Sequence, residues 1–343
     1  MQKDLQEQAY WLLLVFESDL SLRVVNDILI AWCYQQGRTL QEFFAAGPEE
    51  WSAACHLKPE MIEKLERAKE KLVAQAFLVE QMAHDHIHLL TVLDDNYPRL
   101  LKSSLKRNQT PPVLFYAGDL QILERKTIAI IGSRNASETS LAFTRDVACY
   151  LAEQGANVIS GNARGVDRTA YEGATSTQDG HTTVVLPHGV RKLSGVQMRN
   201  LLPRIEAGKV LLLSQFHPDA QWVVSRAMER NKVVTGLAQI VIVAEADTKG
   251  GTWEGAKSAL EQHRPLYVRH TESPPSLPGN KALIERGGHP LPWPTENLAE
   301  TFAPLLQESA ALRQQQDGLP TRPDQLSLLA TYATDGVVAD DLP

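Results

Sequence analysis

Residues 127–134 read TIAIIGSR, and this stretch decides the fold class of the chain. Residues 128–131 are apolar and mostly β-branched, a composition that predicts a short buried strand. Gly132 follows directly and lets the backbone turn tightly, and an amphipathic segment that predicts a helix begins near Glu138. Strand, tight turn and helix in this order form the repeating unit of an α/β fold.

Further short apolar runs follow along the chain, and amphipathic stretches separate most of them. The runs are residues 158–159, 182–186, 210–213, 240–243 and 266–268. Short buried strands that alternate with helices indicate a doubly wound, largely parallel sheet. Ligands of such sheets bind beyond the carboxyl ends of the strands, so the loops that follow the strands carry the candidate site.

The segments that flank the predicted sheet differ from it in composition. Residues 1–88 place apolar residues at helical spacing, which predicts an all-helical module of the SAM or helix-hairpin-helix kind. Residues 89–126 are expected to form an irregular connector, because their prolines rule out a continuous helix. The sheet domain is assigned to residues 127–300, and the polar segment 301–343 is expected to be a flexible tail.

Charge is distributed unevenly along the chain. The formal net charge is −7, which argues against a basic surface over the whole molecule. Residues 127–269 nevertheless hold 16 basic and 13 acidic side chains, against 18 basic and 28 acidic in the remainder. The sheet domain can therefore hold a small anion site. No apolar run approaches the roughly 20 residues of a membrane span, and the chain is expected to be cytoplasmic and without membrane contact.

The first loop after a predicted strand contains Gly132, Ser133 and Arg134. The helix that follows offers unpaired backbone N–H groups to an anion, and an arginine side chain can bind a phosphate with two hydrogen bonds.

The second loop repeats this arrangement, because two glycines bracket a basic residue immediately before a helix. Its candidate residues are Ser160, Gly161, Arg164 and Gly165, with Asp167 expected to cap the helix. Successive parallel strands bring both loops to one edge of the sheet, which predicts a shared anion site.

The third loop, residues 245–254, again ends a strand and opens a helix. It contributes the candidates Lys249, Gly250, Gly251 and Thr252. Trp253 is placed either on a nucleic-acid base by stacking or in the core of the protein.

A further polar cluster precedes the run at residue 240. It consists of Arg226, Arg230, Asn231 and Lys232. Arg230 and Lys232 are two positions apart on a helix and cannot share one face, so one of them is expected to reach the site while the other pairs elsewhere.

Several of these elements, in this order, resemble the DNA-processing protein A (DprA/Smf) family between about residues 8 and 293. The matching elements are Tyr97-Pro98; Pro111-Pro112 with Leu114, Tyr116 and Gly118; Ala129 to Arg134; Ile159 to Asp167; Arg230 to Leu237; and Gly279 to Gly288.

The resemblance implies an extended Rossmann-like domain that forms a homodimer, binds single-stranded DNA and passes it to the RecA recombinase. This is the task of a DNA-processing protein in recombination and natural transformation. Carried over by position, the residues that hold the strand are Arg134, Arg164, and Arg230 or Lys232. The resemblance implies no catalytic residue, cofactor or metal, so we predict a binding protein and not an enzyme.

The chain departs from the family pattern at four places. A family histidine is Tyr171 here, an S-G-S loop is Gly250-Gly251-Thr252, an S-E pair is Ser214-Gln215, and a P-G pair is Arg269-His270. A diverged member with another task, such as defence against foreign DNA, is therefore an alternative to RecA loading.

Two other classes of function compete with DNA binding. Gly250-Gly251-Thr252 with Glu254 faintly resembles the loop of the LOG-type nucleotide phosphoribohydrolases, but the spacing from threonine to glutamate is one residue short. Such a slip turns a helical side chain by about 100°. The third class is a non-catalytic sensor of a small nucleotide in the same pocket. His84, His86 and His88 suggest a metal site, but spacing by two and the lack of nearby ligands favour a surface segment.

Overall fold

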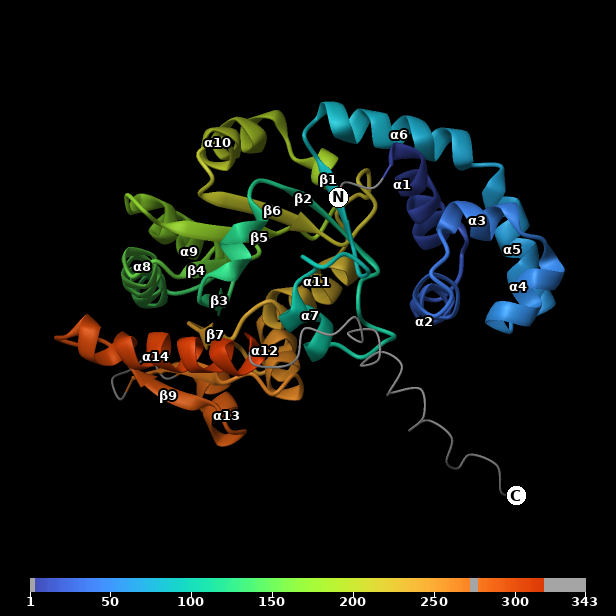
Figure 1. Cartoon of the computed structure of the whole chain (residues 1–343). Helices are drawn as coiled ribbons and strands as arrows, with labels where there is room; N and C mark the ends of the chain where they lie inside the picture. Colours follow the sequence, from blue (N-terminus) through green and yellow to red (C-terminus); the bar gives the residue numbers. More distant parts are fainter. Residues whose placement is uncertain (1–3, 272–276, 318–343) are drawn as a thin grey trace, which may run out of the picture. The chain divides into compact units, whose positions relative to one another are not determined.

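A computed structural model describes residues 4–271 and 277–317, and the chain folds into two units (Figure 1). Of the described residues, the first unit takes 4–97 and 105–114, and the second takes 98–104, 115–271 and 277–317.

The first unit is mostly helical, which confirms the predicted N-terminal helical module. Three tryptophans, Trp11, Trp32 and Trp51, are completely or almost completely buried and form much of its core. The unit also holds the short strand β1 (His88–Thr91). Its helices are α1 (Leu5–Leu12), the π-helical η1 (Leu13–Glu17), α2 (Leu22–Ile28), the π-helical η2 (Leu29–Tyr34), α3 (Leu40–Ala45), α4 (Pro48–Cys55), α5 (Pro59–Lys69) and α6 (Leu72–His84).

The second unit is built on a largely parallel sheet, which confirms the predicted fold class. Its strands lie side by side in the order β2-β6-β5-β4-β3-β7-β8-β9, and only the pairing of β2 with β6 is antiparallel among the pairings of these strands. The six predicted strands are all present as β3 to β8. The strands are β2 (Val113–Ala117), β3 (Thr127–Ile131), β4 (Asn157–Ser160), β5 (His181–Val185), β6 (Val210–Ser214), β7 (Ile240–Val243), β8 (Leu266–His270) and β9 (His289–Pro292).

The winding of this sheet reverses at its centre. From β3 the chain moves outward through β4, β5 and β6, then crosses back to place β7 on the other side of β3. The loops after β3 and β7 therefore flank the point where the strand order reverses, which is where ligands of doubly wound sheets bind.

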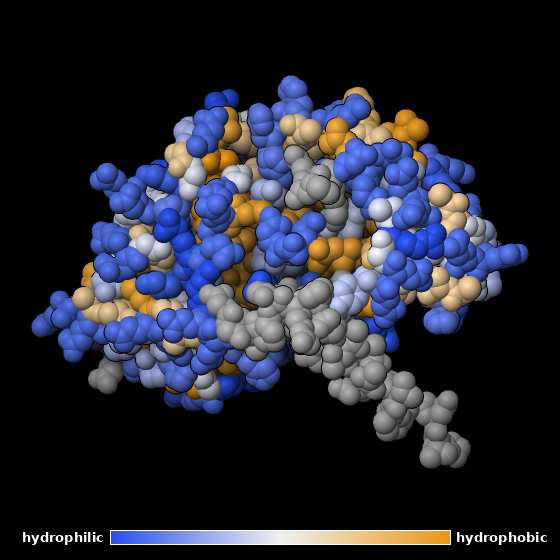
Figure 2. All heavy atoms as spheres, in the orientation of Figure 1, coloured by the Kyte–Doolittle hydropathy of each residue, from blue (hydrophilic) through white to orange (hydrophobic). Residues whose placement is uncertain are grey.

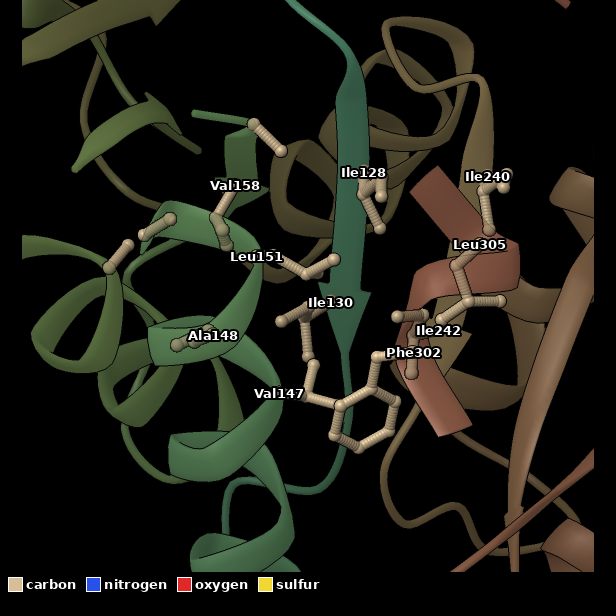
Figure 3. Close-up of a cluster of buried hydrophobic side chains, with 14 of the residues drawn as sticks. Ile128, Ile130, Val147, Ala148, Leu151, Val158, Ile240, Ile242, Phe302 and Leu305 are labelled. Atoms are coloured by element: carbon tan, nitrogen blue, oxygen red, sulfur yellow. The ribbon is translucent and has the colours of Figure 1, made fainter. Parts of the chain in front are cut away.

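One face of the sheet is covered by α8 (Glu138–Glu153), α9 (Val166–Ser176) and α14 (Leu298–Asp317). Figure 3 shows side chains of α8 and α14 meeting against β3, where Ile130, Val147 and Phe302 point toward one another. Residues of a strand alternate between faces, so Ile131 lies on the side opposite Ile130, toward Gly255 of α12 (Gly251–Glu261).

The helix α12 packs against α11 (Val224–Gly236), and the two contact β5, β7 and β8. The remaining helical elements of the second unit are α7 (Arg99–Ser104), η3 (Leu120–Glu124), η4 (Val190–Lys192), α10 (Gly195–Glu206) and α13 (Pro278–Glu285).

The structure differs from the sequence-based expectation in the two flanking segments. Residues 89–126 were expected to be irregular but contain β2, α7 and η3, because the prolines stand between these elements and not inside them. Residues 301–317 were assigned to a flexible tail but belong to α14. Phe302, Leu305 and Leu306 lie on one face of that helix and are buried together with Ser309, while Gln307, Gln314 and Gln315 are exposed. The rest of the expected tail, 318–343, lies outside the described residues.

Hydrophilic residues cover most of the face drawn in Figure 2, and hydrophobic residues form smaller groups on it. None of the helices formed by the described residues has the length and apolar character needed to cross a membrane.

Candidate functional site

A pocket of about 340 Å³ opens beyond the carboxyl ends of β3, β4 and β7. Most of the predicted site residues line it, from all three loops and from α11. Those that line it are Gly132, Ser133, Arg134, Gly161, Arg230, Asn231, Lys249, Gly250, Gly251 and Thr252.

The first and second loops are in direct contact, as their position on neighbouring strands predicts. A Cβ atom on Gly132 would lie 2.5 Å from a methyl carbon of Val166, so only glycine fits there. Gly165 has φ +83°, and a Cβ atom on it would lie 2.4 Å from the Ser133 carbonyl oxygen. The Val166 N–H donates to that same oxygen at 3.2 Å. These contacts bring the two loops together at one edge of the sheet.

The third loop is joined to the first by Glu245, the second residue after β7. Its carbonyl oxygen accepts from the Ser133 N–H at 2.9 Å. Its carboxylate accepts from the Ser137 N–H at 3.0 Å and from the hydroxyls of Ser137 and Ser140 at 2.7 and 2.5 Å. Burial alone would raise the pKa of Glu245, but the hydrogen bonds from Ser140 and Ser137 together lower it below its ordinary value.

One departure from the family pattern supports this junction. Arg269, which stands where the family has proline, is buried, with Nε donating to the Ala244 carbonyl at 3.0 Å and Nη2 to the Ser140 hydroxyl at 2.7 Å. Asn280 accepts from the Ala246 N–H at 2.8 Å. The end of β7 is thus held by side chains from both β8 and α13.

Five of the residues that line the pocket have exposed side chains: Arg134, Trp222, Val224, Asp247 and Lys249. We call three of them, Arg134, Trp222 and Lys249, the pocket rim. Among the described residues neither Arg134 nor Lys249 forms an ion pair, so both cations can meet an anion. No side chain caps the amino end of α12 at Gly250, which leaves backbone N–H groups directed toward the pocket.

Beneath the rim, three less exposed side chains form what we call the pocket floor: Asp167, Arg230 and Asn231. Arg230 is only 3% exposed, and its Nη1 donates to the carbonyls of Gly161, at 3.0 Å, and Val185. Its Nη2 lies 4.0 Å from Oδ2 of Asp167. Burial raises the pKa of Asp167, and the Arg230 guanidinium partly opposes this rise.

The floor differs from the sequence-based expectation in two respects. Arg230 was predicted to hold DNA phosphates, but its guanidinium is bonded inside the protein. Asp167 was expected to cap α9, but its carboxylate accepts from the Gly161 N–H at 3.2 Å, and Gly165 occupies the cap position without a side-chain bond.

Four predicted site residues do not line the pocket. Ser160 is fully buried, and Gly165 packs against the first loop. Arg164 is exposed, but its guanidinium is turned onto the first loop, with Nε donating to the Arg134 carbonyl at 3.3 Å and Nη2 to the Asn135 side chain. Lys232 is half-buried. Of the three basic residues on α11, Arg226, Arg230 and Lys232, only Arg230 lines the pocket, as the spacing of Arg230 and Lys232 allows.

The aromatic residue at the pocket is Trp222 and not Trp253. Trp253 is 8% exposed and packs in the interior, with the Arg286 guanidinium 5.1 Å from its ring centre. Trp222 is 46% exposed and its ring centre lies 5.7 Å from the guanidinium carbon of Arg134. The signal in the sequence that could have found it is an aromatic residue in the polar loop before the basic helix α11.

Glu254, the carboxylate required by the hydrolase alternative, does not line the pocket. It is exposed on α12 and forms an ion pair with Lys257 at 2.9 Å. The one-residue difference in spacing places Glu254 on another side of α12. No carboxylate of α12 therefore lines the pocket.

Comparison with known proteins places these features in a family. Residues 88–302 match the model of the family described as DNA recombination-mediator protein A. Protein Smf of Synechocystis is 29% identical over 82% of this chain and 67% of its own length. Protein Smf of Escherichia coli is 29% identical over 64% of this chain and 57% of its own length. DNA processing protein DprA of Streptococcus pneumoniae is 30% identical over 52% of this chain and 61% of its own length. The chain thus spans roughly three fifths to two thirds of these relatives.

Solved structures show the same fold. The DNA processing protein A of Streptococcus pneumoniae superposes with a TM-score of 0.62 at 23% identity, covering 84% of this chain and 95% of that one. The DNA processing protein A of Helicobacter pylori, which binds single-stranded DNA, superposes with a TM-score of 0.55 at 27% identity, covering 65% of this chain and 96% of that one.

Proposed function

The chain belongs to the DNA recombination-mediator protein A family, and from this premise we propose that its pocket binds single-stranded DNA without catalysing a reaction. The observation that carries the proposal is the pocket rim, where two unpaired cations and an exposed indole meet at one opening. The chain belongs to a family of DNA-processing proteins, and a relative of known structure binds single-stranded DNA, which supports the same proposal.

The rim matches the chemistry of a nucleotide within a strand. Arg134 and Lys249 supply positive charge for phosphate, and the free N–H groups of α12 supply further donors. Trp222 offers a flat apolar surface on which a base can stack. In duplex DNA the bases are already stacked on each other, so this combination favours a single strand.

The test is a titration of labelled oligo-dT over a series of salt concentrations. We expect binding that weakens steeply with salt, since each phosphate neutralised on a single strand contributes a slope of about 0.7 in log K against log salt. Arg134→Ala and Lys249→Ala should each weaken binding and reduce that slope. A duplex of the same length should bind more weakly than the single strand.

Arg199→Ala is the matched control, because Arg199 is an exposed cation on α10 that does not line the pocket. It should leave affinity and slope close to those of the wild type. If Arg134→Ala and Lys249→Ala behaved like this control, the pocket would play no part in DNA binding.

A free nucleotide is the second candidate ligand. The pocket volume of about 340 Å³ lies near the lower end of the range of about 300–1,000 Å³ found for small-molecule sites. Binding of thymidine monophosphate without binding of oligo-dT would support a nucleotide sensor and contradict the DNA proposal.

The family relationship extends the proposal to partners. We expect a homodimer, which light scattering would detect as twice the mass of one chain. We also expect that the protein helps RecA assemble on single-stranded DNA, measured as faster RecA filament formation on DNA coated with a single-strand-binding protein.

A further inference from the structure

We propose that Arg230 and Asn231 of the pocket floor are positioning residues that hold the second and third loops at the separation the DNA strand requires, without contacting the strand. This inference rests on the proposed DNA-binding function. The sequence predicted that both residues bind DNA, whereas the proposal assigns them to holding the loops in place.

Arg230 joins α11 to the ends of two strands. Its guanidinium donates to the carbonyl oxygens of Gly161, after β4, and Val185, at the end of β5. It also lies 4.0 Å from the carboxylate of Asp167, which itself accepts from the Gly161 N–H at 3.2 Å. Both polar groups of the Gly161 backbone are therefore held by the floor.

Asn231 continues this chain of bonds to the third loop. Its Oδ1 accepts from Arg230 Nε at 3.3 Å, and its Nδ2 donates to the carbonyl oxygen of Gly251 at 3.1 Å. Gly251 is the first residue of α12 and lines the pocket. Two adjacent side chains thus connect Gly161 on one wall of the pocket to Gly251 on another.

The fit of Arg230 against the second loop leaves no room for a ligand between them. A Cβ atom on Gly161 would lie 2.0 Å from Nη1 of Arg230 and 2.3 Å from its Cζ. Arg230 is 3% exposed, its Nη1 donates to backbone carbonyls, its Nε donates to Asn231, and its Nη2 lies 4.0 Å from the Asp167 carboxylate, so it has little capacity left for a phosphate. Arg134 and Lys249 are exposed and remain available for that contact.

Positioning and phosphate contact have different signatures in solution. Removal of a phosphate contact lowers both the affinity and its salt dependence, because fewer counterions are released on binding. Removal of a positioning bond lowers the affinity but leaves the number of phosphate contacts, and hence the salt slope, unchanged.

The experiment compares Asn231→Ala with Lys249→Ala in oligo-dT titrations over a salt series. We expect Asn231→Ala to weaken binding about tenfold, the equivalent of one lost hydrogen bond, with the wild-type slope. Lys249→Ala should weaken binding and lower the slope by about one phosphate contact. A reduced slope for Asn231→Ala, or unchanged affinity, would overturn the proposal.

Hydrogen exchange of the protein without DNA separates this inference from the proposed function. Asn231→Ala should speed exchange of the amides around residues 250–254, whereas Lys249→Ala and the control Arg199→Ala should not. Unchanged exchange in Asn231→Ala would contradict the positioning role even if DNA binds as proposed. Faster exchange in a protein that binds no oligo-dT would support the positioning role and contradict DNA as the ligand.

Arg230 itself is tested with a double variant, because Arg230→Met alone leaves the Asp167 carboxylate buried and unpaired. Arg230→Met with Asp167→Asn removes both charges, and we expect it to fold and to bind DNA at least tenfold more weakly with an unchanged slope. Wild-type affinity in this variant would overturn the role assigned to Arg230.

Discussion

The pocket rim and the pocket floor each contain an arginine, Arg134 from the loop after β3 and Arg230 from α11, but the two guanidinium groups have different surroundings. Arg134 on the rim is exposed and forms no ion pair with the described residues, whereas Arg230 on the floor is buried, donates to two carbonyl groups and lies 4.0 Å from a carboxylate. The difference teaches that a phosphate-binding sequence pattern does not by itself show which basic side chains have free donors. On this ground we propose phosphate contact for the exposed Arg134 and a positioning role for the buried Arg230.

The largest expected effect tests the floor. Arg230→Met should destabilise the protein by about 3–5 kcal/mol, because it leaves the Asp167 carboxylate buried without its partner. The measurement is the free energy of unfolding in urea. Adding Asp167→Asn should recover much of the loss, and a single variant as stable as wild type would show that the floor carries no structural charge pair.

The next effect tests the rim. Arg134→Ala should weaken oligo-dT binding by about 1.5–3 kcal/mol, the range for a hydrogen bond to a charged group, while the melting temperature stays unchanged. Arg164→Ala should have a smaller effect, since Arg164 is turned onto the first loop and does not line the pocket. Equal losses of oligo-dT affinity in the two variants would mean that the DNA strand follows the outside of the first loop.

A third effect distinguishes the two tryptophans. Trp222→Ala should weaken oligo-dT binding by about 1 kcal/mol or more without changing the salt slope, because stacking on a base releases no counterions. Trp222→Phe should retain most of the affinity. Trp253→Phe should change stability and not binding, since Trp253 is only 8% exposed.

The smallest expected effect concerns Glu245, which joins the first loop to the third. The pKa of Glu245 is lower in the folded protein than in the unfolded chain, so its charge stabilises the fold above the ordinary pKa of glutamate, near 4.3. That contribution is lost as the pH falls through the lowered value.

Glu245→Gln should therefore cost about 1 kcal/mol of unfolding free energy at pH 7, and the difference from wild type should shrink below pH 4. Urea unfolding at both pH values is the measurement. If the difference in unfolding free energy between the variant and the wild type did not change with pH, the charge of Glu245 would not contribute to stability.

Much of the sheet could be predicted from the sequence, because its buried strands are short apolar runs between helical stretches. The runs at β3 and β7 lie within one or two residues of the strands in the structure. The sequence also placed Arg134 and Lys249 in loops that follow such strands, and both line the pocket. Arg230 lines it too, but nothing in its local sequence shows that Gly161 and Asp167 lie against it.

The sequence alone determined the alternation of strands and helices and the glycine-rich turns at the strand ends, since both depend on residues close together in the chain. The tertiary structure decided which arginine is free, which tryptophan faces the opening, and that residues 301–317 complete the core as part of α14. Those outcomes depend on burial, and burial is set by side chains that come from distant parts of the chain and meet only when the sheet has formed.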